Sequence, residues 1–364
     1  MRMPSILFCC ALLAGCSKRA DTEPGQTVKE AAKPETPVPP KPEIPRVEPK
    51  STPASTPKVE VRNAEWYEKA AARGDAAAQA KLGGMYADGS DGISKDEAKA
   101  VEWLRKAAAQ GDASALDRLG NLFAEGKCVP KDQAEALTWL EKAAANGHAA
   151  AQSKLGVLYS DGVAVPKDEA KAADLIQKAA AQGNAVAQFN LGVMHAIGRG
   201  IPKDEAKAVE WYQKSAAQGY APAEANLGGM YADGLGITKD DAKAFGWFQM
   251  AAAQGHAVAQ FNLAIRYAAG LGVSKDEAKA AEWLQKSAFQ GYPAAQFNLG
   301  VMYANGLGGP KDSVRAFVWY TLAARQNDRE AIAEREALAA FMTPQQMTDA
   351  EKLLDDLFGK MPAK

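Results

Sequence analysis

The chain has 364 residues, a formal net charge of −1 and 8% aromatic residues. Because positive and negative side chains nearly cancel, a nucleic-acid surface, which needs a basic excess, is not expected. Abundant alanine and few aromatic residues favour closely packed helices over sheets. Three of the four cysteines lie within the first 16 residues and only Cys128 lies in the body, so no disulfide framework is expected within one chain.

Residues 1–15 have the features of a secretory signal peptide. Arg2 supplies a positive charge, and Ile6 to Leu13 form an apolar core that is too short for a permanent membrane helix. The segment ends in a Leu-Ala-Gly-Cys motif that resembles the lipobox of bacterial lipoproteins. The resemblance implies cleavage before Cys16 and its acylation with chains such as palmitate, which anchors the protein to a membrane. Ser17, in place of aspartate, implies by the family's sorting rule the outer membrane, facing the periplasm. A plain signal peptide with a chance cysteine is the alternative.

Residues 16–58 follow as a linker that starts at the lipidated cysteine. Ten prolines occur between Pro24 and Pro57 among Lys, Glu, Thr and Ala, and no hydrophobic periodicity is present. Such a segment favours extended polyproline II, with a reach on the order of 100 Å at ~3.1 Å per residue. Two interpretations stay open: a spacer whose length matters, or a simple disordered tether.

A repeat of about 36 residues occupies residues 59–327. A tryptophan, a glycine, a leucine and a second glycine recur in phase, which predicts a stack of repeated units. The tryptophan column reads Trp66, Trp103, Trp139, Leu175, Trp211, Trp247, Trp283 and Trp319. Seven full units are expected, at about 74–110, 111–146, 147–182, 183–218, 219–254, 255–290 and 291–326.

Each unit is predicted to hold two antiparallel helices. In the best example, the range Lys95–Ala109 has apolar residues on one helical stripe. Asp96 is placed to cap its first turn, and Gly111 ends it in a left-handed conformation. The next helix runs from Asp112 to about Ala124. Helices of this second kind contain an internal glycine, such as Gly83, which costs about 1 kcal/mol relative to alanine. We therefore expect a neighbouring helix to approach closely there.

The columns resemble the Sel-one-like repeat, a subclass of the tetratricopeptide-like helical repeats. The stretches Gly255–Leu263 and Lys203–Tyr212 carry the resemblance, which covers about residues 62–327. It implies an all-α, right-handed solenoid of antiparallel helix pairs and an adaptor surface for protein partners. The chain lacks the cysteine pairs of one secreted branch, so the penicillin-binding activity ascribed to that branch does not carry over.

Capping helices are expected at both ends of the stack. Ala64 to Ala72 forms a lone first helix, and residues 328–364 form the C-terminal cap. Within that cap, Thr343 to Gln346 has the pattern of a capping box with proline at the first helical position.

No catalytic, metal or cofactor site is predicted. His148, His195 and His256 lie in different units, so they do not form a metal site. Cys128, in a turn, leaves three hypotheses open: a reactive thiol, an intermolecular bridge, or a neutral loop substitution. No cluster of unique residues is expected to break the repeat pattern, as an enzyme would require.

One column suggests a binding site. The same position carries a basic residue in the first three units and asparagine in the last four: Lys81, Arg118, Lys154, Asn190, Asn226, Asn262 and Asn298. Regularly spaced amides can hydrogen-bond the backbone of an extended peptide, and the basic residues would favour acidic sequences. The structural alternative is that each asparagine ties its own helix to a neighbouring loop.

The sequence therefore predicts a monomeric, non-enzymatic scaffold, lipid-anchored in the bacterial cell envelope, that binds an unidentified protein or peptide along the solenoid. A cell-wall (peptidoglycan) binding protein and an envelope hydrolase are the alternatives.

Overall fold

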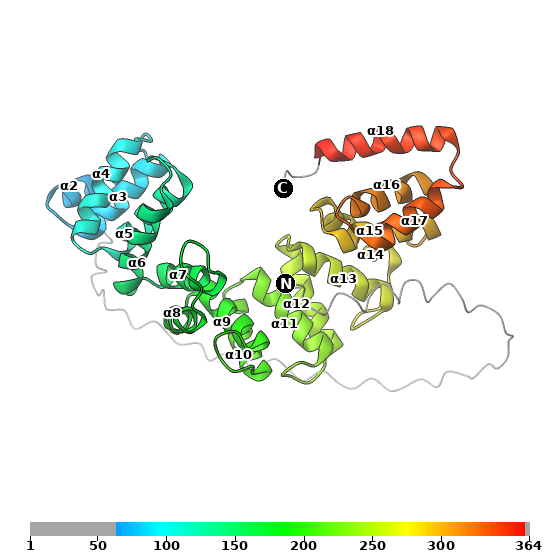
Figure 1. The fold of residues 1–364 in the computed structure, drawn as a ribbon, viewed down its shortest axis with the longest axis horizontal. Helices are drawn as coiled ribbons and strands as arrows, with labels where there is room; N and C mark the ends of the chain where they lie inside the picture. Colours follow the sequence, from blue (N-terminus) through cyan, green and yellow to red (C-terminus); the bar gives the residue numbers. More distant parts are fainter. Residues whose placement is uncertain (1–62, 361–364) are drawn as a thin grey trace, which may run out of the picture. The chain divides into compact units, whose positions relative to one another are not determined.

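The computed structural model describes residues 63–360, which form seventeen helices and no strand (Figure 1). The predicted signal peptide, Cys16 and the proline-rich linker lie outside these residues. The helices are α2 (Ala64–Ala72), α3 (Ala76–Asp88), α4 (Glu97–Ala109), α5 (Ala113–Glu125), α6 (Gln133–Ala145), α7 (Ala149–Asp161), α8 (Glu169–Ala181), α9 (Ala185–Ile197), α10 (Glu205–Ala216), α11 (Ala221–Asp233), α12 (Asp241–Ala253), α13 (Ala257–Ala269), α14 (Glu277–Phe289), α15 (Pro293–Asn305), α16 (Ser313–Ala324), α17 (Arg329–Ala339) and α18 (Pro344–Lys360).

The helices from α2 to α16 are of two alternating kinds. The A helices (α2, α4, α6, α8, α10, α12, α14 and α16) carry the tryptophan column. The B helices (α3, α5, α7, α9, α11, α13 and α15) carry the internal glycine column. Every two consecutive helices from α2 to α17 pack against each other, and contacts also join neighbouring B helices, such as α3 with α5 and α7 with α9. The predicted all-α solenoid of consecutive helix pairs is confirmed.

Residues at the helix ends explain the regularity of the pairs. Asp96 accepts a hydrogen bond from the backbone N–H of Lys99 at 3.0 Å, and an aspartate caps the A helices of the later units in the same way. B helices end at a left-handed glycine, for example Gly126 with φ 71°. The predicted cap at Asp96 and the predicted left-handed residue at Gly111 (φ 81°) are both confirmed.

The internal glycines of the B helices permit the close approach that the sequence predicts. A Cβ atom added at Gly83 would lie 2.8 Å from Leu104 Cγ, too close for any real side chain. Both residues are buried, and Leu104 belongs to the apolar core that runs through the first units. The A and B helices are therefore packed at a distance that only glycine allows at this position.

Neighbouring units are joined by a relay of buried glutamines that the sequence analysis does not predict. Gln260 in α13 donates to the carbonyl of Ala252 at 3.2 Å, and its own side-chain oxygen accepts from Gln290 at 2.8 Å. Because Gln260 is 5% exposed, both bonds satisfy polar groups inside the joint. The same pair of bonds recurs at Gln79 with Gln110, Gln152 with Gln182, Gln188 with Gln218, and Gln296 with Gln326.

The C-terminal cap forms as predicted. The Gln346 N–H donates to Thr343 Oγ1 at 3.2 Å, while the Thr343 N–H donates to Gln346 Oε1 at 2.9 Å, which completes a reciprocal capping box. Helix α18 then packs against α16. Across residues 63–360, none of the helices is both long and apolar enough to cross a membrane.

Candidate functional site

The basic part of the predicted column lies on B helices, where each residue faces a carboxylate. Lys81 Nζ is 3.9 Å from Asp91, and Arg118 Nη1 is 3.8 Å from Asp88. Lys154 Nζ lies 2.9 Å from Asp117. These pairs balance the positive charge locally, and the binding of an acidic partner by this part of the column stays a prediction.

The asparagine part of the column is not uniform. Asn262 donates to the carbonyl of Val258 at 2.9 Å, and Asn298 donates to that of Ala294 at 2.8 Å, so both bonds stay within their own helix. Asn226 instead hydrogen-bonds the hydroxyl of Tyr212, whose pKa is raised to about 12 by burial. The structural alternative supposed that each asparagine ties its helix to a neighbouring loop, but these three bonds are made to helical residues instead.

Burial also divides the asparagines. Asn298 is only 1% exposed and its side-chain oxygen has no partner, so a peptide running over the surface does not reach it. Asn190, Asn226 and Asn262 are half-buried and reach the surface. Peptide binding by the asparagines of the column therefore stays a prediction for Asn190, Asn226 and Asn262, whereas Asn298 is too buried to take part.

A cavity of about 410 Å³ lies beside the same column, between α5, α6 and α7. Its wall is mostly apolar and includes Gly120, Asn121, Leu137, Leu140, Lys154 and Val157. A volume of this size is within the range of small-ligand pockets, about 300–1,000 Å³. Lys154, predicted from the sequence as a binding residue, thus stands at the edge of a hollow that the sequence did not predict.

The cavity exists because Leu140 does not cover Gly120. At other glycines of this column, the side chain from the following A helix lies directly on the glycine. For example, a Cβ at Gly156 would lie 2.6 Å from Ile176 Cγ1, and one at Gly192 would lie 2.7 Å from the Tyr212 ring. At Gly120 the nearest atom is the backbone oxygen of Ala136, at 3.2 Å, and no side-chain atom of Leu140 is among the three nearest. The Leu140 side chain therefore does not cover Gly120, although the backbone of α6 approaches it.

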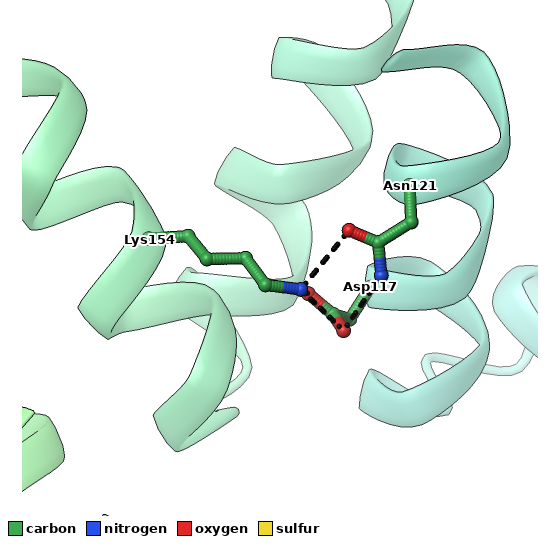
Figure 2. A network of polar contacts seen from close by, with 3 residues as sticks. All are labelled: Asp117, Asn121 and Lys154. Atoms are coloured by element: carbon green, nitrogen blue, oxygen red, sulfur yellow. Dashed lines mark hydrogen bonds and ion pairs between the residues drawn. The ribbon is translucent and has the colours of Figure 1, made fainter. Parts of the chain in front are cut away.

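Lys154 and Asn121, which line the cavity, form a polar network with Asp117 (Figure 2). Lys154 Nζ, reaching from α7, donates to both carboxylate oxygens of Asp117 at 2.9 and 3.0 Å and to Asn121 Oδ1 at 3.0 Å on α5. Asn121 also donates to Asp117 at 3.3 Å. The Asp117 side chain is 11% exposed, so its partners stabilise a charge that is largely out of water. One ammonium and one carboxylate leave the network without net charge.

This network joins a repeat-specific residue to one that follows the basic column. The position of Asp117 varies along the repeats and holds Ala80, Ser153, Phe189, Ala225, Phe261 and Phe297 elsewhere. The signal was visible in the sequence, but only the structure brings the two residues of neighbouring units together.

Exposed aliphatic side chains surround the same region. Val157, Val163 and Val186 are 36%, 58% and 41% exposed, and all three line the cavity. They come from α7, the turn after it, and α9. An apolar hollow with an apolar margin and a neutral polar edge is suited to bind an apolar group that carries one hydrogen-bonding atom.

The histidines and Cys128 do not form a second site among the described residues. No group of three or more His, Cys, Asp or Glu side chains there is placed to hold a metal ion. His256 caps its own helix, accepting from the Ala259 N–H at 3.2 Å, and burial lowers its pKa. Burial raises the pKa of the Cys128 thiol, which disfavours the reactive thiolate at neutral pH.

The fold places the chain among α-solenoid proteins built from repeated helix pairs. The sequence model of the Sel1 repeat matches residues 56–75, 76–112, 113–148, 149–184, 185–220, 221–256, 257–292 and 293–328. The chain belongs to the Sel1 repeat family. The first of the eight segments contains a single helix, α2, and the other seven correspond to the seven full units predicted from the sequence.

The chain is similar to several solved structures. A Sel1 repeat protein from Oxalobacter formigenes is 36% identical over 76% of this chain and 79% of its own, with a TM-score of 0.60. A protective antigen of uropathogenic Escherichia coli is 31% identical over 82% of this chain and 79% of its own, with a TM-score of 0.39. An immunity protein from Pseudomonas aeruginosa is 24% identical over 64% of this chain and 84% of its own, with a TM-score of 0.37. No curated protein matches the chain significantly.

Proposed function

We propose that this Sel1 repeat protein is a non-enzymatic scaffold of the bacterial envelope, anchored through acylated Cys16, that binds an extended segment of a partner protein on its B helices. Sel1 repeat proteins commonly mediate protein interactions. The observation that carries the proposal is the apolar cavity between α5, α6 and α7, next to Lys154 in the predicted binding column. An interface needs such an anchoring pocket near its centre, because a few desolvated contacts supply most of the binding energy.

The surroundings of the cavity support a polypeptide partner. The three exposed valines extend the apolar surface beyond the cavity itself, and Asn190 continues the column on the next B helix. A partner segment would place one side chain in the cavity and its neighbours along the B helices.

Site-specific photo-crosslinking in the native envelope tests this function. A benzophenone amino acid replaces Val157 at the cavity, and the matched control carries it at Met250, which is 44% exposed at the end of an A helix. We expect a discrete crosslinked protein at position 157 and none at position 250. Equal crosslinking at both positions, or none at either, would contradict the proposal.

The cell-wall alternative has its own measurement. Purified peptidoglycan sacculi are sedimented with the mature chain. Retention of the wild-type chain on sacculi, together with no crosslinked protein at position 157, would replace protein binding by cell-wall binding.

A further inference from the structure

We propose that the cavity between α5, α6 and α7 binds a phenolic ring, the side chain of a tyrosine on the partner protein. This inference rests on the proposed function and names the residue type that the site takes. It is drawn from a comparison of this cavity with the same place two repeats further along the chain.

Two repeats later, a tyrosine of the protein itself fills the equivalent space. Tyr212 stands at the position of Leu140, Gly192 at that of Gly120, and Asn226 at that of Lys154. The Tyr212 ring lies on Gly192, is 2% exposed, and its hydroxyl hydrogen-bonds Asn226. Gly192 and Asn226 therefore lie at the two ends of a slot whose length is that of one phenol ring with its hydroxyl.

The last full unit repeats this arrangement. Tyr320 covers Gly300 in the same way, with ring atoms 2.6 and 2.7 Å from the position of an added Cβ. The Tyr320 ring also contacts Phe297, with ring centroids 5.7 Å apart, as Tyr212 contacts Phe189 at 5.8 Å. At the cavity, Leu140 stands in place of the tyrosine and Asp117 in place of the phenylalanine. The helices around the slot are therefore the same, but no aromatic ring of the protein fills it.

The polar edge of the cavity fits a phenol better than a charged group. Lys154 and Asp117 neutralise each other, so a carboxylate or an ammonium would lose its hydration without gaining an opposite charge. A phenol hydroxyl donates one proton, and the side-chain oxygen of Asn121, which lines the cavity, has a further lone pair to accept it. The aromatic face gains the contact with Gly120 and the leucines of α6.

The source of the ring is a polypeptide rather than a free phenol. Val157, Val163 and Val186 are exposed next to the cavity, where residues flanking a tyrosine would cover them. A free phenol would leave this apolar margin in water. Tyrosine is also among the side chains that most often anchor protein interfaces.

Methyl-detected NMR titration of the whole mature chain tests the inference. The probes are N-acetyl-tyrosinamide and 4-methylphenol, with N-acetyl-leucinamide as the aliphatic comparison. We expect both phenols to shift the methyl signals of Val157 and Leu137 saturably, with at least tenfold weaker binding of the leucine compound. Absence of saturable shifts, or equal binding of the leucine compound, would overturn the inference.

Two variants locate the binding. Leu140→Tyr should fill the cavity as Tyr212 fills its own slot, and should abolish binding of both phenols while the circular dichroism spectrum stays helical. Tyr212→Leu should open a second slot and raise the stoichiometry from one to two. Unchanged phenol binding in Leu140→Tyr, or a stoichiometry of one in a folded Tyr212→Leu variant, would each overturn the inference.

The crosslinking experiment separates this inference from the proposed function. A partner crosslinked at position 157 in wild type but lost in Leu140→Tyr supports both. A partner that persists in Leu140→Tyr overturns the tyrosine slot alone, whereas no partner at position 157 overturns the proposed function.

Discussion

Gln254 donates a hydrogen bond of 2.8 Å to a carboxylate oxygen of Glu224, in a joint between units where the acceptor in five other joints is the amide oxygen of a glutamine. Glu224 is 4% exposed, and burial raises the pKa of its carboxyl. In those five joints the glutamine also donates to a backbone carbonyl of the preceding A helix, a bond that an ionised carboxylate cannot make. The joint at Glu224 therefore has one hydrogen bond fewer than the joints built on glutamine.

Glu224→Gln should stabilise the protein at neutral pH. The raised pKa means that the folded state holds the proton more tightly than the unfolded state. The loss of folding stability caused by ionising Glu224 is therefore absent when the pH is below the ordinary carboxyl pKa of 4.5. It grows as the pH rises towards the raised pKa of the folded state and is complete above that pKa. We expect a gain of about 1 kcal/mol at pH 7.5, the size of one buried hydrogen bond, that shrinks as pH falls to 4.5. Urea unfolding at several pH values measures it.

The reverse change in another joint is the control for Glu224. Gln260→Glu should destabilise the protein at pH 7.5 and recover part of the loss on acidification. If the difference between Glu224→Gln and wild type does not depend on pH, the role assigned to Glu224 is wrong.

Lys154 and Asp117 should show strong coupling in a double-mutant cycle. Lys154→Met leaves a largely buried carboxylate with Asn121 as its remaining side-chain partner, and should cost about 1–3 kcal/mol. In the Asp117→Ala background the same change should cost much less. Lys81→Met is the comparison, because its exposed 3.9 Å pair should be worth less than about 1 kcal/mol. Additive costs at Lys154 and Asp117 in urea unfolding would contradict the network.

Asn190 and Asn262 test the remaining part of the asparagine column. Asn190→Ala combined with Asn262→Ala removes two amides that reach the surface, and should weaken the crosslink at position 157 with little change in helical content. Asn226 is left intact, because it supports the buried hydroxyl of Tyr212. Asn298→Ala is the matched control and should leave capture unchanged, since its side chain is buried. Equal capture by all of these variants would remove the column from the binding surface.

Alanine at two equivalent glycines should have unequal effects on stability. Gly192→Ala places a Cβ 2.7 Å from the Tyr212 ring and should destabilise the protein by about 1–3 kcal/mol, as overpacking does. At Gly120 the nearest atom is the backbone oxygen of Ala136, 3.2 Å away, and no side chain lies closer, so the helix propensity of alanine, about 1 kcal/mol, offsets most of the strain. Thermal unfolding of both variants measures the difference. Equal losses of stability would mean that Gly120 is covered as closely as Gly192.

Cys16→Ser tests the anchor. We expect this variant to lose metabolic palmitate labelling and to move from the detergent phase to the aqueous phase on Triton X-114 partitioning, because the acyl chains supply the membrane affinity. The control is Cys10→Ser, which lies within the predicted signal peptide and should behave as wild type. Unchanged labelling of Cys16→Ser would exclude lipidation at this residue.

The sequence alone determined the repeated helix pairs, their caps and the family. Asp96, Gly111 and Thr343 act through bonds to residues a few positions away, so their roles follow from local order along the chain. The internal glycine column also predicted close helix packing, because its cost in helix propensity needs a compensating contact.

Only the tertiary structure decided where the solenoid is open. The cavity depends on the direction in which Leu140 points relative to Gly120, and on Lys154 reaching Asp117 in the preceding unit. The regular spacing of the sequence does not predict these differences. A repeat period indicates the helix face on which each residue lies, but not how far its side chain extends toward the next unit. The Tyr212 slot and the cavity share one repeat position, which holds tyrosine in one unit and leucine in the other, and only the packing shows that this leucine leaves Gly120 uncovered.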